Sequence, residues 1–173
     1  LITAVIIFNE TLGINEVKLF NNSIIIDYFS SLMKILTILS AFLVLAISSN
    51  YLKIFKIFKI EYPILILSSV LGMMIMISSN DLIVFYMGLE LQSLALYVLA
   101  TFNRDQLKSS EAGLKYFVLS ALSSGLLLYG CSLIYGFTGS TNFNIIAEQL
   151  NSSEYALTFG IAVSYTHLRA HET

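Results

Sequence analysis

The sequence predicts an all-α fold, a polytopic transmembrane helix bundle. Of its 173 residues, 57% are hydrophobic and 12% are charged, whereas soluble domains carry about 25% charged residues. The mean hydropathy is +0.81. Long apolar runs follow one another between short polar segments, without the alternation typical of membrane barrel strands. Such runs satisfy their backbone hydrogen bonds in lipid by forming helices.

Four segments are long enough to cross a bilayer, which takes about 20 apolar residues. They run approximately over Ile24–Ser49, Tyr62–Ser79, Asp81–Thr101 and Glu111–Phe137. The apolar run at residues 1–8 is too short to span, and we expect it to be the end of another helix. A further run begins near Tyr155 and breaks off at about Val163. Residues 1–163 are therefore expected to be a fragment of a transmembrane domain.

The last ten residues, SYTHLRAHET, bring charged and polar side chains into this last apolar run. The string resembles a translated sequencing adapter, so residues 164–173 are expected to be a non-native tail. His167 and His171, the two histidines of the chain, both lie in this tail, and no metal centre is indicated in the rest of the sequence.

Basic residues mark one side of the membrane. The loops after the first and third predicted spans carry Lys53, Lys56, Lys59, Arg104 and Lys108, whereas the loops of the opposite side offer only Lys18. A Lys/Arg excess in short loops faces the cytoplasm, or the matrix in a mitochondrion. The formal net charge of −2 gives no basic surface for nucleic acid. With Cys131 as its single cysteine, the chain can build no internal disulfide or cysteine-ligated cluster.

Glu90 lies near the middle of the third span, within the stretch NDLIVFYMGLELQSLALYVLA. Counted from Asp81, its depth is roughly 13–14 Å in a core about 30 Å thick. A charge at that depth costs at least about 2.5–3.5 kcal/mol, and such residues commonly serve ion or proton paths. Tyr86, Ser93 and Tyr97 share its helix face and could supply hydroxyl groups. The alternative is a protonated carboxyl with a purely structural role.

Two lysines inside the predicted spans are further candidates. Lys34 lies roughly 15 Å from the start of the first span, so it either pairs with Glu90 or snorkels to the interface. Lys115 follows Glu111 by four residues, and the spacing alone predicts an interfacial ion pair. Asp27 is expected at the membrane edge. The small residues Ser120, Ser123, Ser124 and Gly125 are expected to serve close helix packing.

Two long motifs carry a resemblance to a known family. GLELQSLALYVL and SSEAGLKYFVLSALSSGLLLYGCSLIYGFTG resemble the antiporter-like subunit 2 of respiratory complex I, the proton-translocating NADH:ubiquinone oxidoreductase. The similarity covers roughly residues 20 to 163. It implies part of a fourteen-helix membrane subunit in which Glu90 is the buried acid and Lys115 lies on the proton route. The family's lysine partner of the acid lies on the next helix, beyond the point where this sequence leaves the pattern.

The resemblance also implies partners and cofactors. The subunit would bind no cofactor itself, whereas NADH, FMN, iron–sulfur clusters and ubiquinone belong to the whole complex. Its partners would be the other membrane subunits of complex I and the lipid bilayer. The composition, rich in Ile, Asn, Lys and Phe, suggests an AT-rich genome, so the expected location is the mitochondrial inner membrane, with a bacterial plasma membrane as the alternative.

Two other classes of protein remain open on the sequence. One is a related cation/proton antiporter or membrane hydrogenase subunit, which shares the expected fold and charge scheme. The other is a non-catalytic membrane scaffold in which Glu90 and Lys34 pair only to fix helix register.

Overall fold

The computed structural model describes residues 16–54, 60–103, 106–150, 161–162 and 165. The elements in order are β1 (Val17–Leu19), β2 (Ile24–Ile26), α2 (Tyr28–Ile54), α3 (Glu61–Ser78), α4 (Leu82–Ala100), α5 (Leu107–Thr138) and α6 (Phe143–Leu150). The expectations for residues 1–8, for most of the run after Tyr155, and for the tail with His167 and His171 lie outside the described residues. So do Lys56, Lys59, Arg104 and the side chain of Lys53.

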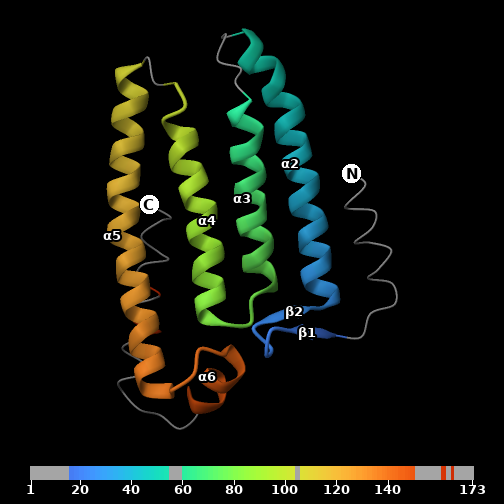
Figure 1. Ribbon diagram of the computed structural model, residues 1–173, viewed down its shortest axis with the longest axis vertical. Helices are drawn as coiled ribbons and strands as arrows, with labels where there is room; N and C mark the ends of the chain where they lie inside the picture. Colours follow the sequence, from blue (N-terminus) through green and yellow to red (C-terminus); the bar gives the residue numbers. More distant parts are fainter. Residues whose placement is uncertain (1–15, 55–59, 104–105, 151–160, 163–164, 166–173) are drawn as a thin grey trace.

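Among the described residues, α2, α3, α4 and α5 are long and apolar enough to cross a membrane. They stand side by side in chain order, each antiparallel to the next (Figure 1). Large apolar side chains such as Leu36, Leu43, Ile47 and Leu67 are exposed on the outer helix faces, where lipid or further helices can cover them. The predicted multi-pass helical membrane protein is confirmed.

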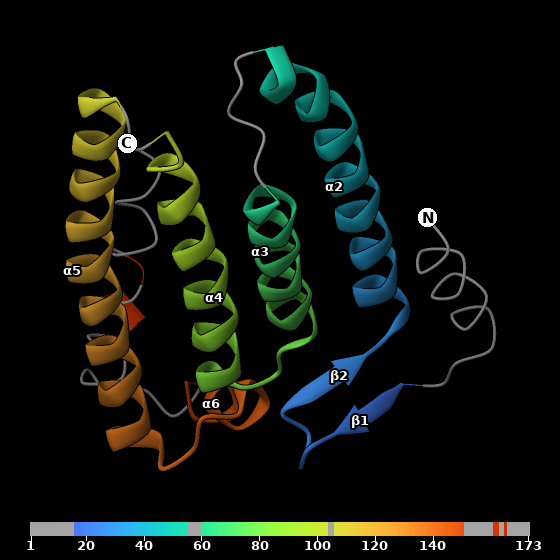
Figure 2. The ribbon, with the colours of Figure 1, turned by 45° about the horizontal axis from the view of Figure 1, so that its top comes forward.

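The loops gather at two ends of the bundle. Figure 2 shows the hairpin of β1 and β2, the α3–α4 turn and α6 at one end, where the turn and α6 lie close to each other. The last turns of α2 and α4 and the first turns of α3 and α5 lie at the other end (Figure 1). Lys108 in the first turn of α5 is therefore at the end of the bundle opposite to Lys18 of β1, as the charge pattern requires.

The first membrane helix starts later than predicted. Ile24–Ile26 form strand β2, which pairs antiparallel with β1 in the register Val17↔Ile26. The helix begins at Tyr28 because Asp27 caps it: Asp27 Oδ1 accepts a hydrogen bond of 2.8 Å from the Ser30 N–H. In return, Ser30 Oγ accepts a hydrogen bond of 3.0 Å from the Asp27 N–H. This reciprocal capping satisfies donors that the first helical turn leaves free.

The turn between α3 and α4 ties three parts of the chain together. The buried Asn80 donates its backbone N–H to the Ser23 carbonyl (2.8 Å) and its side-chain amide to the Asn22 carbonyl (2.9 Å). Its own carbonyl accepts from the Phe143 N–H (3.1 Å). Asp81 caps α4 by accepting from the Ile83 N–H (2.9 Å). The start of α4 is thus fixed to both the hairpin and α6.

The end of α5 was not predicted in detail from the sequence. Gly139 terminates the helix with a left-handed φ of 65° and donates its N–H to the Tyr135 carbonyl at 2.7 Å, a conformation that favours glycine. The following loop folds into the short helix α6, whose Ile146 is buried in an apolar cluster with Leu127 and Ile134 of α5.

Candidate functional site

Glu90 lies in the middle of α4. It follows Leu82 by eight residues in a helix of 19 residues, which places it about 12 Å from the helix start. The residue is partly buried, and its Oε1 atom is buried with no hydrogen-bond partner within the described residues. A carboxylate oxygen without a partner is costly in a medium of low dielectric constant. The structure thus places Glu90 at the middle of α4, and its depth in the membrane stays a prediction.

The side chains on its helix face turn toward α5. The Tyr86 phenol interacts with the Glu90 carboxylate and with the Ser124 hydroxyl of α5. About two turns beyond Glu90, the Tyr97 ring packs edge-on against Tyr116 of α5, with ring centroids 4.9 Å apart. The predicted face thus exists, and it forms part of the α4–α5 interface.

Ser93 does not supply the hydroxyl expected of it. Its Oγ donates to the Leu89 carbonyl at 2.6 Å and lies 3.2 Å from the Glu90 carbonyl. A serine hydroxyl carries one hydrogen atom, and here that hydrogen points to the backbone of its own helix. Such back-bonding competes with contacts to neighbouring side chains, so Tyr86 is the nearer candidate for a partner of Glu90.

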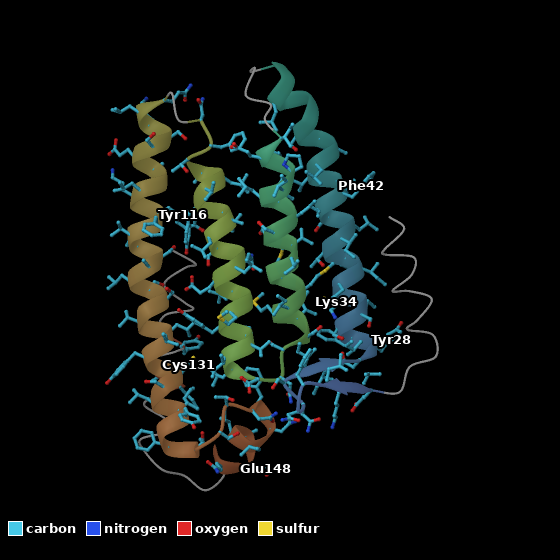
Figure 3. The ribbon with its side chains drawn as sticks, viewed as in Figure 1. Tyr28, Lys34, Phe42, Tyr116, Cys131 and Glu148 are labelled. Atoms are coloured by element: carbon cyan, nitrogen blue, oxygen red, sulfur yellow. The ribbon has the colours of Figure 1, made fainter. Side chains whose placement is uncertain are left out.

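Lys34 is not brought together with Glu90. It lies six residues after Tyr28 in α2, about 9 Å into the helix, and is shallower than predicted because the helix begins four residues later. α3 stands between α2 and α4 (Figure 1), and Figure 3 shows Lys34 on the far side of α3 from α5. The charged group that interacts with Lys34 is Asp27 of the same chain segment.

Lys115 forms the ion pair that its spacing predicts. Its Nζ lies 2.6 Å from Glu111 Oε1, and the two side chains are 69% and 56% exposed. It is the one salt bridge among the residues that the structure describes. The exposed Lys115 side chain has Glu111 as its salt-bridge partner among the described residues. Its expected place on a proton route stays a prediction.

The interface contains a residue that the sequence assigned only to packing. Ser120 of α5 is 2% exposed, and its Oγ has no hydrogen-bond partner within the described residues. The sequence did not indicate a buried hydroxyl without a partner at this position, because small residues on one helix face are typical of close packing. Cys131, on the same face of α5, is buried as a free thiol in the apolar cluster.

Metal ligands do not gather in the part of the chain that the structure describes. No group of three His, Cys, Asp or Glu side chains is placed there to hold a metal ion. The expectation that this subunit binds no cofactor stays a prediction.

Among the described residues, four helices long enough to cross a membrane, one of them with a partly buried carboxylate at its middle, define a multi-pass helical membrane protein. Comparison with known families narrows this class. The family described as "NADH:quinone oxidoreductase/Mrp antiporter, TM" matches residues 79–167. The chain belongs to this family.

Curated relatives are similar over most of the chain. It is 74% identical over 161 residues to the NADH-quinone oxidoreductase subunit N of Pelagibacter ubique, covering 93% of this chain and 34% of the relative. It is 57% identical over 143 residues to the subunit of the same name from Maricaulis maris, covering 82% and 30%. The chain thus spans about a third of the length of these relatives.

Solved structures share the fold. The archaeal membrane-bound sulfane sulfur reductase superposes with a TM-score of 0.78 at 25% identity, over 96% of this chain and 36% of that chain. Respiratory complex I from Thermus thermophilus with bound aureothin gives 0.75 at 24% identity, over 96% and 35%. The Mrp complex from Dietzia gives 0.69 at 24% identity, over 96% and 33%. The antiporter-like fold implied by the sequence motifs is confirmed.

Proposed function

We propose that this chain is part of a proton-translocating membrane subunit of a NADH:quinone oxidoreductase. The observation that carries the proposal is the Glu90 carboxylate, partly buried at the middle of α4, with one oxygen that has no hydrogen-bond partner among the described residues. The 74% identity to a subunit N supports the enzyme class.

Glu90 would work by gaining and losing a proton as nearby charge moves. A positive charge close to a buried carboxylate favours the ionised form, and its withdrawal favours the protonated form. Because α4 is apolar around Glu90, the low dielectric constant strengthens this coupling. The two protonation states then correspond to two conformations whose populations the enzyme shifts during turnover.

The lysines have distinct proposed roles. Lys115 would carry charge along the route, held at rest by its ion pair with Glu111. Lys34 lies on α2, which α3 separates from the helix of Glu90 (Figure 1). It would therefore act on a different part of the route, where its charge interacts with that of Asp27. Lys34 is the weaker candidate of the two, since its position also suits an interfacial lysine.

The location we propose is a bacterial plasma membrane. The relatives reported above come from bacteria, so the mitochondrial inner membrane expected from composition is not supported. The partners would be other membrane subunits of the oxidoreductase and the surrounding lipid. NADH, FMN, iron–sulfur clusters and the quinone would act elsewhere in the complex, and this subunit would bind none of them.

The test is Glu90→Gln in the complete subunit of the assembled enzyme, which removes the charge and keeps the shape. Proton pumping per NADH oxidised should fall, while assembly is retained. The matched control is Glu148→Gln, because Glu148 is exposed on α6 at the end of the bundle (Figure 3). Unchanged proton pumping in Glu90→Gln would contradict the proposal and favour a structural role for Glu90.

A cation/proton antiporter is the second candidate, because the family description includes the Mrp antiporter and the Mrp complex shares the fold. Purification of the complete subunit from its native membrane separates the two. Recovery with a NADH-oxidising complex supports the first proposal. Recovery with an assembly that exchanges cations without NADH oxidation supports the antiporter.

A further inference from the structure

Two buried oxygen atoms belong to side chains on the helix faces by which α4 and α5 contact each other. Glu90 shares its face with Tyr86 and Tyr97, and Ser120 shares its face with Tyr116 and Ser124. Glu90 Oε1 on α4 and Ser120 Oγ on α5 are buried and have no hydrogen-bond partner within the described residues. A buried polar atom left unsatisfied costs about 1–3 kcal/mol. Such atoms in native proteins are satisfied by protein groups or by ordered water.

The packing of the two helices places these atoms at the same level. Tyr97 of α4 contacts Tyr116 of α5, and Tyr86 of α4 interacts with Ser124 of α5. Glu90 lies one turn beyond Tyr86, about 6 Å along α4. Because the helices are antiparallel (Figure 1), Ser120 lies one turn from Ser124 in the same direction, again about 6 Å.

Ser120 also differs from other serines of the same helices. Ser93 Oγ donates to the Leu89 carbonyl, Ser124 Oγ to the Ala121 carbonyl and Ser132 Oγ to the Tyr129 carbonyl, at 2.6, 3.4 and 2.9 Å. This back-bonding is the usual fate of a serine hydroxyl in a membrane helix. Ser120 makes no such bond, so its hydrogen is available to a group outside its own helix.

We infer that Glu90 Oε1 and Ser120 Oγ hold a common water molecule between α4 and α5. A buried water typically makes two to four hydrogen bonds to polar groups, and the Tyr86 and Ser124 hydroxyls stand one turn away to extend the network. Ser120 is then a positioning residue for proton exchange at Glu90, a role that rests on the proposed function.

The proton exchange between Glu90 and this water conserves every atom and charge. When Glu90 is protonated, its carboxyl O–H donates to the water oxygen. When the proton leaves, it passes to that water, which releases one of its own protons to the next hydrogen-bonded group and then donates to the Glu90 carboxylate. The water keeps its composition, and Ser120 fixes its position in both states.

The test is Ser120→Ala in the complete subunit of the assembled enzyme. Infrared difference spectroscopy reports the C=O stretch of the Glu90 carboxyl, which is assigned by its disappearance in Glu90→Gln. Ser120→Ala should shift this band and remove a water band sensitive to H₂¹⁸O. It should also slow proton pumping by about tenfold, the order expected for loss of one hydrogen bond to a charged group. Bands unchanged by Ser120→Ala would overturn the inference.

The matched control is Ser132→Ala on the same helix, because the Ser132 hydroxyl already donates to the Tyr129 carbonyl and is exposed. It should leave both bands and pumping unchanged. Should Ser120→Ala not assemble, a map of the wild-type complex that shows ordered waters decides the matter. Density within about 2.7–3.2 Å of both oxygens supports the site, and its absence at that resolution rejects it.

The outcomes separate this inference from the proposed function. If Ser120→Ala shifts the Glu90 band but Glu90→Gln leaves pumping intact, the water site stands and the proton-translocating role fails. If Glu90→Gln abolishes pumping but Ser120→Ala changes neither band, the role stands and the water site fails.

Discussion

Gly72 of α3 and Gly88 of α4 meet backbone to backbone. A Cβ atom added to Gly72 would lie 2.8 Å from the Gly88 carbonyl oxygen, and one added to Gly88 would lie 2.9 Å from the Gly72 carbonyl oxygen. Real Cβ atoms do not approach other atoms so closely, and rigid backbone cannot give way as a flexible side chain would. Small residues allow membrane helices this close an approach. The pair holds α3 directly against the helix that carries Glu90.

Replacing either glycine by alanine should therefore force the two helices apart. We expect Gly72→Ala and Gly88→Ala each to destabilise the subunit by about 1–3 kcal/mol, the usual range for overpacking. The midpoint of thermal unfolding in lipid nanodiscs measures this. Gly125→Ala on α5 is the control, because a Cβ there meets nothing within 4 Å. Equal midpoints for Gly72→Ala and Gly125→Ala would contradict the account.

The start of α2 should weaken in acid. Hydrogen bonding from the Ser30 backbone N–H to the Asp27 carboxylate lowers the pKa of Asp27 below its usual 3.8. A carboxyl whose pKa is lowered in the folded state stabilises that state above pH 3.8 and loses this contribution as the pH falls through the folded value. Thermal stability measured from pH 6 to pH 3 should decline at the low end.

Asp27→Asn is the matched variant for this acid effect. Asparagine caps helices about as well as aspartate but does not titrate, so its contribution should not change with pH over the same window. Asp27→Ala should lose about 1 kcal/mol at neutral pH through loss of the cap. An acid decline of the same size in Asp27→Asn and in wild type would assign the effect to other groups.

The ion pair between Lys115 and Glu111 should matter little for stability. Both side chains are more than half exposed, and exposed pairs at this spacing contribute about 0.3–0.5 kcal/mol. We therefore expect Glu111→Gln to leave the unfolding midpoint nearly unchanged. Lys115→Gln should leave stability equally unaffected but lower proton pumping if Lys115 carries charge along the route. Full pumping in Lys115→Gln would reduce this residue to an interfacial lysine.

Lys34 and Glu90 should act independently, because α3 separates their helices (Figure 1). A double-mutant cycle with Lys34→Met and Glu90→Gln, read as stability, should give a coupling energy below about 0.5 kcal/mol. The cycle of Asp27→Asn with Lys34→Met should give the larger coupling, since these two groups interact. Strong coupling between Lys34 and Glu90 would require a different helix arrangement in the complete subunit.

The turn at Asn80 should be sensitive to a single amide. Asn80 is buried and donates to the Asn22 carbonyl of the hairpin. Asn80→Ala leaves that carbonyl without its partner, which should lower the free energy of unfolding by about 1–3 kcal/mol. Asn144→Ala in α6, where the side chain is exposed, provides the control and should be nearly neutral. Limited proteolysis near the hairpin, faster only in Asn80→Ala, would locate the effect.

Local patterns along the sequence were sufficient to predict several features of the fold and of the candidate site. Four spans follow from hydropathy because a helix in lipid needs an apolar run of fixed length. The pairing of Lys115 with Glu111 follows from a spacing of four residues, which places both on one helix face. The mid-membrane depth of Glu90 follows from counting residues, because the rise per residue of a helix is constant. The motifs around Glu90 also indicate the family, because they are long and specific.

Other features depended on which segments became neighbours in space. The strand at Ile24–Ile26 exists only because β1 pairs with it, and its apolar residues otherwise continue the helical run. Lys34 and Glu90 are apart because α3 packs between their helices. The contact between Gly72 and Gly88 and the burial of Ser120 likewise arise from helix packing. Hydropathy and spacing are local properties that determine each helix, whereas the order and closeness of helices result from contacts between residues distant in sequence, and only the tertiary structure decided those.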